Sequence, residues 1–233
     1  MWITMKESIF GRNKEHLSYS SWKLWKTSKD QYRRRYYEGE KGFVSLETEF
    51  GNKIHEMIEN RDPLLSHIPQ HSISEHPISV YIEGNKVIGR IDSFDEEKVS
   101  FLDWKTSHAT KEGKAPWDKL KVRKLEQLPF YSMLLREKYG KVNTVCHLVW
   151  IETEFKDRTI EFDGHILETE KKELVLTGKV KKFRRTIAKW ERKRMREDLI
   201  KTANEIKKDY VEYTTSSTQV HVGDFKERTQ EVS

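Results

Sequence analysis

The stretch VSFLDWK, residues 99–105, constrains the fold of this chain more than any other segment. Its apolar run is typical of a strand that is buried on both faces, where unpaired charges are costly. Alternation along such a strand places Asp103 and Lys105 on one face, roughly 7 Å apart at about 3.3 Å per residue, and turns Trp104 to the other face. The carboxylate and the ammonium group therefore point into one space.

A second carboxylate, Asp92, comes from the strand expected directly before this one. The stretch VIGRID places Asp92 near a strand end after Gly89, and the two strands are predicted to form an antiparallel hairpin. Neighbouring carboxylates repel each other unless a cation lies between them. Two hard oxygen ligands beside a lysine indicate a divalent metal site for Mg²⁺ or Mn²⁺, in which the lysine offsets charge on a phosphate. The alternative is a strand-end ion pair between Asp103 and Lys105, with Asp92 as a turn residue.

The composition limits the class of protein. With 233 residues, 35% hydrophobic and 35% charged, the chain can form one sizeable α/β core under a charged surface. Its single cysteine, Cys146, excludes an internal disulfide, a multi-cysteine zinc site and a four-cysteine iron–sulfur cluster, and fits a reducing cytoplasm. The sequence shows neither a signal peptide nor the roughly 20 apolar residues of a membrane span, so we expect a soluble intracellular protein. A net charge of +6 is compatible with a polyanionic partner.

Hydrophobic periodicity predicts helices and short strands in a mixed order. Helices are expected over residues 18–37, 45–60, 125–139 and 183–210. Strands are expected over residues 78–83, 86–94, 98–104, 142–153 and 158–162. The first helix has an aromatic face that we expect to pack on the core, and the last helix is long and basic. We expect a single domain over residues 1–213 and a polar, flexible tail over residues 214–233.

Two of the expected helices carry polar residues at one-turn spacing. In FGNKIHEMIE, Gly51 precedes His55 by four residues, so another segment can approach the surface from which His55 projects. In EQLPFYSMLL, Gln127 and Tyr131 lie above each other on one helix face. Each pair also has an ordinary interpretation, a packed or surface histidine in the first case and a helix edge in the second.

Four short motifs follow one another along the chain: Gly51-x-x-x-His55, Gly89-x-x-Asp92, Asp103-x-Lys105 and Gln127-x-x-x-Tyr131. This series resembles that of the RecB-like branch of the PD-(D/E)XK nuclease superfamily, over roughly the first two thirds of the chain. The resemblance implies an α/β fold with a restriction-endonuclease-like core, in which a mixed central β-sheet is flanked by α-helices. It also implies a metal site whose ligands are His55, Asp92, Asp103 and the backbone carbonyl of Trp104. Lys105 would position or activate the attacking water, and Gln127 and Tyr131 would line the catalytic site beside it.

The chain departs from its relatives in two respects. The second acidic position of the family motif is aspartate, Asp103, where glutamate is frequent. In the CRISPR-associated adaptation nucleases and the AddB-type nucleases, which the first helix resembles, a cysteine that holds an iron–sulfur cluster follows the serine-rich start. The stretch Thr27-Ser28-Lys29 occupies that region here, and we expect no iron–sulfur cluster.

Basic residues near both ends of the chain are candidates for contacts to nucleic-acid phosphates. They are Arg33, Arg34 and Arg35 of the first helix, and Lys182, Arg184 and Arg185 of the segment expected to begin the last helix. The alternative is a solvated charged face, balanced by neighbouring acidic residues.

The sequence therefore predicts a metal-dependent DNA nuclease. By family resemblance it is an exonuclease that processes single- or double-stranded DNA ends in recombination, repair or phage replication, in the cytoplasm of a prokaryotic or phage-infected cell. A single-strand or structure-specific endonuclease and a non-catalytic DNA-binding subunit that retains the nuclease fold are the alternatives. The sequence leaves open whether the chain forms a homo-oligomer or has a recombination or replication partner protein.

Overall fold

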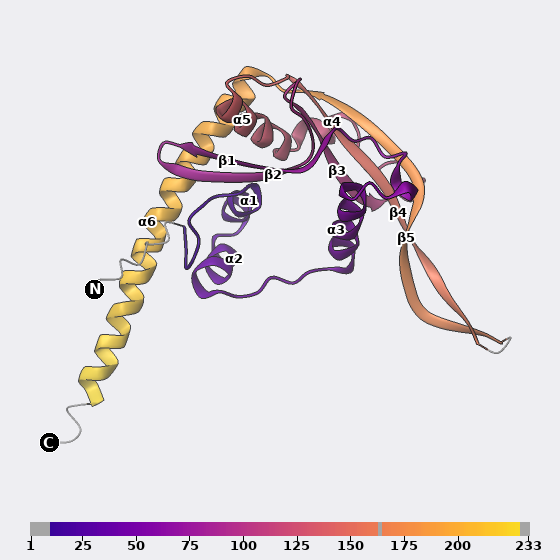
Figure 1. Ribbon diagram of the computed structural model, residues 1–233. Helices are drawn as coiled ribbons and strands as arrows, with labels where there is room; N and C mark the ends of the chain where they lie inside the picture. The colour runs from indigo at the N-terminus through magenta and orange to yellow at the C-terminus, as the bar shows by residue number, and fades with distance from the viewer. Residues whose placement is uncertain (1–9, 163–164, 229–233) are drawn as a thin grey trace. The chain divides into compact units, whose positions relative to one another are not determined.

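The computed structural model describes residues 10–162 and 165–228 (Figure 1). The described part of the chain divides into two compact units, neither of which is a continuous segment. The first unit contains residues up to Gly42, Ser79–Ile88 and the residues from Lys193 onward. The second contains Phe43–Ile78 and Gly89–Arg192.

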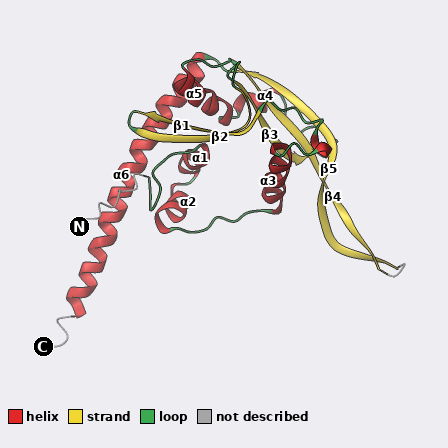
Figure 2. Cartoon of the chain, in the orientation of Figure 1, coloured by secondary structure: helices red, strands yellow, loops and turns green. Residues whose placement is uncertain are grey.

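Five strands of the described chain form one mixed sheet in the order β1-β2-β3-β4-β5 (Figure 2). They are β1 (Ile73–Ile82), β2 (Asn85–Asp95), β3 (Ser100–His108), β4 (Val145–Phe162) and β5 (His165–Thr186). The pairs β2–β3 and β4–β5 are antiparallel, whereas β3 and β4 run parallel. A parallel pair needs a long crossover, and helices α4 (Lys119–Lys124) and α5 (Gln127–Tyr139) provide it.

The two faces of β3 contact different helices of the second unit. Leu102 and Trp104 belong to a buried cluster with Ile54 and Ile58 of α3 (Leu46–Glu59). The neighbouring Phe101 points to the opposite face, where its ring meets Tyr131 of α5 edge-on at 6.0 Å. The sheet therefore has helices on both faces, and the predicted restriction-endonuclease-like α/β fold is confirmed.

Local signals explain where these helices begin and end. The Ser45 side chain accepts a hydrogen bond from Thr48 N at the start of α3. Gly140, in a left-handed conformation with φ 68°, ends α5. Along the chain, the short 3₁₀ helix η2 (Pro63–Leu65) follows α3 and precedes β1.

The first unit pairs the N-terminal helices with the long C-terminal helix. It contains α1 (Tyr19–Thr27), α2 (Lys29–Arg33), the π-helix η1 (Arg34–Glu38) and most of α6 (Lys189–Arg228). The predicted aromatic face is buried at Trp22, Trp25 and Tyr32, so its interpretation as a packing face is confirmed. Along α6, an apolar stripe is buried as well, formed by Met195, Leu199, Ala203 and Ile206.

Several expectations about secondary structure were wrong. The helix expected over residues 18–37 is divided into α1, α2 and η1, and the first strand begins at Ile73 instead of residue 78. Residues 183–186 belong to β5, and α6 begins at Lys189, because Phe183 to Thr186 continue a ladder of backbone pairs with β4. The helix then continues to Arg228, beyond the predicted end at residue 210. The two strands expected over 142–153 and 158–162 are one strand, β4. No helix in the described ranges is both long and apolar enough to cross a membrane.

Candidate active site

Asp92 and Asp103 meet where β2 pairs with β3 in the second unit. Ser93 pairs with Leu102 in the antiparallel register, so the next residues along, Asp92 and Asp103, face each other. The Trp104 N–H donates a hydrogen bond of 2.6 Å to Asp92 Oδ2. The two strands that the sequence predicted as a hairpin thus bring both carboxylates together.

Both carboxyl groups are buried in this position. Asp92 is 8% exposed, and its burial and the neighbouring Asp103 raise the pKa of Asp92 to about 7. Asp103 is 1% exposed, and its Oδ2 lies 2.9 Å from Lys105 Nζ. Its Oδ1 has no hydrogen-bond partner among the described residues. Two buried carboxyl groups with an unused acceptor oxygen form a site that favours a cation.

Lys105 lies on the same face of β3 as Asp103, as alternation predicts. Its side chain is 26% exposed. Burial alone would lower the pKa of Lys105, but the carboxylates of Asp103 and Asp92 outweigh this effect and raise it. The lysine is therefore held as a cation at the edge of the site.

His55 reaches the site from α3. A Cβ atom on Gly51 would lie 2.9 Å from Thr106 Oγ1, so the bare glycine permits the close approach of α3 to β3. The His55 ring stands edge-on to Trp104, with ring centroids 5.4 Å apart. Burial alone would lower the pKa of His55, but the neighbouring Glu75 and Asp92 carboxylates raise it.

Glu75 of β1 is a site residue that the sequence motifs did not identify. Its Oε1 lies 3.4 Å from His55 Nδ1, and its Oε2 lies 3.6 Å from Arg90 Nε. One ligand atom from each of His55, Glu75 and Asp92 lies within 4.8 Å of the other two, a spacing suitable for one metal ion. The roles of Asp103 and the Trp104 carbonyl as ligands stay predictions.

Gln127 and Tyr131 contact each other on α5, whose Tyr131 packs against Phe101 of β3. Gln127 Nε2 donates a hydrogen bond of 3.1 Å to Tyr131 Oη. Burial and the nearby Asp103 raise the pKa of Tyr131, so its hydroxyl stays protonated. A Cβ atom on Gly89 would lie 3.1 Å from Tyr131 Cε1 and 2.9 Å from Leu134 Cδ1, so α5 packs directly on this glycine.

The side chains at the candidate active site offer ligand atoms that suit a hard divalent metal ion. Carboxylate oxygens and one imidazole are ligands that Mg²⁺ and Mn²⁺ accept, and a cation would relieve the repulsion between Asp92 and Asp103. The unpaired Asp103 Oδ1 gives the same indication from the structure itself.

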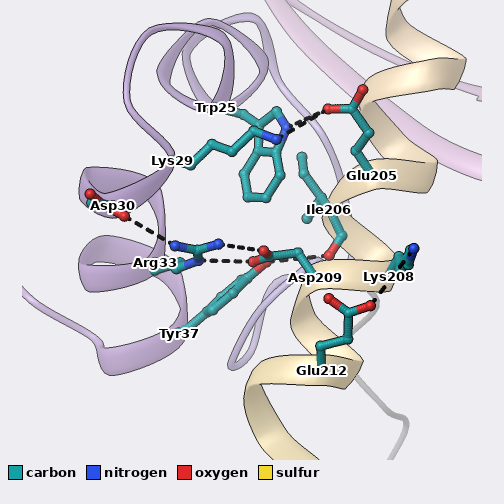
Figure 3. A network of polar contacts seen from close by, with 10 residues as sticks. All are labelled: Trp25, Lys29, Asp30, Arg33, Tyr37, Glu205, Ile206, Lys208, Asp209 and Glu212. Atoms are coloured by element: carbon teal, nitrogen blue, oxygen red, sulfur yellow. Dashed lines mark hydrogen bonds and ion pairs between the residues drawn. The ribbon is translucent and has the colours of Figure 1, made fainter.

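The basic residues predicted to contact phosphates are not among the residues of the candidate active site. Arg33 is paired with Asp209 and Asp30 (Figure 3), whereas Arg34 and Arg35 are exposed. The other three are on strand β5 rather than on a helix, with Lys182 and Arg184 exposed and Arg185 buried. Their contact with nucleic acid stays a prediction.

A mixed sheet with helices on both faces, and two buried carboxylates beside a lysine on adjacent strands, define a restriction-endonuclease-like protein. The chain belongs to the PD-(D/E)XK nuclease superfamily, whose family model matches residues 65–219.

Two solved structures are also similar to the chain. SSO0001 has 14% sequence identity and a TM-score of 0.42, with 82% of this chain and 76% of that chain covered. A protein from Eubacterium rectale, described as a candidate exonuclease, has 13% identity and a TM-score of 0.39, with coverages of 90% and 88%. None of the curated proteins compared with the chain matches it.

Proposed function

We propose that the chain is a divalent-metal-dependent DNA nuclease of the RecB-like branch, acting as an exonuclease at DNA ends. The observation that carries the proposal is the meeting of Asp92, Asp103 and Lys105 at one buried point of the sheet. Membership of the nuclease superfamily supports hydrolysis of phosphodiester bonds. The order of the four motifs supports the branch and the action on ends.

The proposed chemistry assigns a task to each side chain. His55, Glu75, Asp92 and Asp103 hold the metal, which when bound supplies Lewis-acid activation at a phosphate oxygen. Lys105 orients the attacking water and offsets the negative charge that grows on the phosphate. Gln127 and Tyr131 fix the position of the phosphate through neutral hydrogen-bond donors, because the Tyr131 hydroxyl keeps its proton.

The proposal is tested with end-labelled linear DNA, single- and double-stranded, beside a covalently closed circle, in Mg²⁺, Mn²⁺ or EDTA. Lys105→Ala is the inactive variant and Lys98→Ala is its matched control, because Lys98 is a 70% exposed lysine on the same hairpin. We expect metal-dependent loss of linear DNA that Lys105→Ala alone abolishes.

Each other result has a definite meaning. Cleavage of the circle makes the protein an endonuclease. Binding without cleavage by the unaltered chain favours the non-catalytic DNA-binding subunit. Near-normal cleavage by Lys105→Ala contradicts the assignment of the site.

A further inference from the structure

A basic cavity lies within the same unit as the candidate active site. It has a volume of about 310 Å³ and lies between α4, the end of β5 and the first turn of α6. This volume is at the lower end of the range of small-ligand pockets, roughly 300–1,000 Å³, and accommodates one nucleotide. The tasks assigned above to the active-site residues do not use this cavity.

The charge of the cavity lining is strongly positive. Among the described residues, four cationic side chains and one carboxylate line it: Lys119, Arg123, Arg184, Arg185 and Glu191. Lys119 and Arg123 are one turn apart on α4, and they and Arg184 are exposed. No ion pair within the described ranges involves any of these three. Their charges are available to an anion.

Arg185 forms a fixed part of the cavity wall. It is 6% exposed and donates hydrogen bonds to Val122 O at 2.8 Å and Leu125 O at 2.5 Å. It also pairs with Glu191 at 2.8 Å, while its Nε has no acceptor among the described residues. Glu191 in turn accepts a hydrogen bond from Ala188 N, so the only carboxylate of the described lining is already shared between two donors.

Trp190 lines the cavity beside these cations and is 60% exposed. The exposed indole offers a flat surface on which a nucleobase can stack. An aromatic ring next to several cations matches the two parts of a nucleotide, the base and the phosphate.

Strand register relates the cavity to Asp103. Asp103 pairs with Leu148, and Leu148 pairs with Phe183, two residues before Arg185. Arg185 therefore points to the same face as Asp103, and by strand spacing their Cα atoms lie on the order of 12 Å apart. This separation corresponds to a few nucleotides of a strand.

We propose that this cavity binds one nucleotide of a single DNA strand, with its phosphate beside Lys119, Arg123 and Arg184 and its base stacked on Trp190. The inference rests on the proposed function, since the strand held here is the one that would enter the catalytic site. The cavity acts as a secondary holding site for that strand.

The test is the fluorescence anisotropy of a labelled single-stranded oligonucleotide of about 12 nucleotides, measured in EDTA so that cleavage does not intervene. We expect Trp190→Ala to weaken binding by about 5- to 100-fold, and Trp190→Phe to restore most of it. The double variant Lys119→Ala/Arg123→Ala should weaken binding at least about tenfold, and lower the slope of log Kd against log salt by about 1.4. Circular dichroism checks that each variant is folded.

Matched controls are Tyr81→Ala, which removes a 70% exposed aromatic ring, and Lys201→Ala/Lys208→Ala, which removes two exposed lysines of α6. Both should bind as the unaltered chain does.

The two proposals fail separately. If the unaltered chain cleaves linear DNA but the cavity variants bind the oligonucleotide normally, the inference is overturned and the nuclease proposal stands. If the chain binds through the cavity but cleaves nothing, the nuclease proposal fails and the binding site stands. Absence of any oligonucleotide binding overturns the cavity inference.

Discussion

Glu75 is the residue whose role at the candidate active site can be tested without measuring cleavage. If it is a metal ligand with His55 and Asp92, Mn²⁺ should raise the thermal unfolding midpoint of the chain, because an ion that binds only the folded state stabilises it by about 2.7 kcal/mol at 100 times Kd. Glu75→Gln and Asp92→Asn should each remove most of this increase, as measured by differential scanning fluorimetry.

The control for this titration is Glu56→Gln, which changes an exposed glutamate next to His55 on α3. It should respond to Mn²⁺ as the unaltered chain does. If Glu75→Gln also responds normally, Glu75 serves only to orient His55 and the ligand set is the one predicted from the sequence.

The sequence was sufficient to predict the residues that share a motif, but not Glu75. His55 and Asp92 were expected near one another and are. The sequence does not single out Glu75, because the first strand is expected to begin at residue 78, after the proline of the stretch SEHP. Pro77 instead lies in β1, which is an edge strand of the sheet, the position in a sheet where proline is tolerated. Strand order, which decides this, is a property of the tertiary structure.

At the scale of elements, the packing of α5 on β2 gives a second prediction. Gly89→Ala should destabilise the chain by about 1–3 kcal/mol, since the added methyl group meets Leu134 and Tyr131 at 2.9 and 3.1 Å. Urea denaturation measures the loss, and DNA cleavage should fall as well because Tyr131 is displaced.

Gly42→Ala is the comparison for this variant. Its Cβ would meet only the end of the flexible Arg35 side chain, at 3.2 Å, so we expect a change within about 0.5 kcal/mol. Equal urea midpoints for the two variants would show that the space beside Gly89 does not limit the approach of α5.

The contact between α2 and α6 should depend on pH (Figure 3). Arg33 donates to both oxygens of Asp209, at 3.0 and 2.5 Å, and this lowers the pKa of Asp209 below its ordinary value of 3.8. A lowered folded-state pKa stabilises the chain above the unfolded-state value, and this contribution is lost as the pH falls below about 4. Asp209→Asn should therefore cost on the order of 1 kcal/mol at pH 7.

Thermal unfolding of Asp209→Asn and the unaltered chain, compared at several pH values, checks this prediction. The difference between their midpoints should shrink as the pH falls from 5 toward 3. A difference that stays constant over this range would mean that the ion pair does not contribute to stability.

The sequence predicts helices and strands well where its hydrophobic periodicity is strong, and poorly where basic residues interrupt that periodicity. The stretch KVKKFRR, residues 179–185, carries little apolar alternation, so the sequence predicts that the last helix already begins at residue 183. It is part of β5 because its backbone pairs with β4 over a long ladder, with Phe183 opposite Leu148. Pairing between distant strands overrides a weak local preference.

At the scale of the whole molecule, the chain passes repeatedly between its two units. The segment that matches the family model therefore contains parts of both units. The model matches residues 65–219, which leaves out α3 of the second unit as well as α1, α2 and η1 of the first unit. Yet the N-terminal helices bury α6 within the first unit: Trp22 Nε1 donates to Asp198 at 3.0 Å and Trp25 Nε1 to Glu205 at 3.1 Å. The single-domain organisation expected from the sequence stays a prediction.

Removal of residues 1–42 should therefore destabilise the remaining chain, although the truncation spares the catalytic motifs. Loss of Trp22, Trp25 and Tyr37 would expose the apolar stripe of α6 around Leu199 and Ile206, which is buried in the full chain. We expect a lower thermal midpoint by circular dichroism and increased binding of the dye ANS, which reports exposed apolar surface. A truncated chain that melts like the full chain and binds no dye would mean that α6 does not depend on the N-terminal helices for its burial, and that these helices serve another purpose than packing.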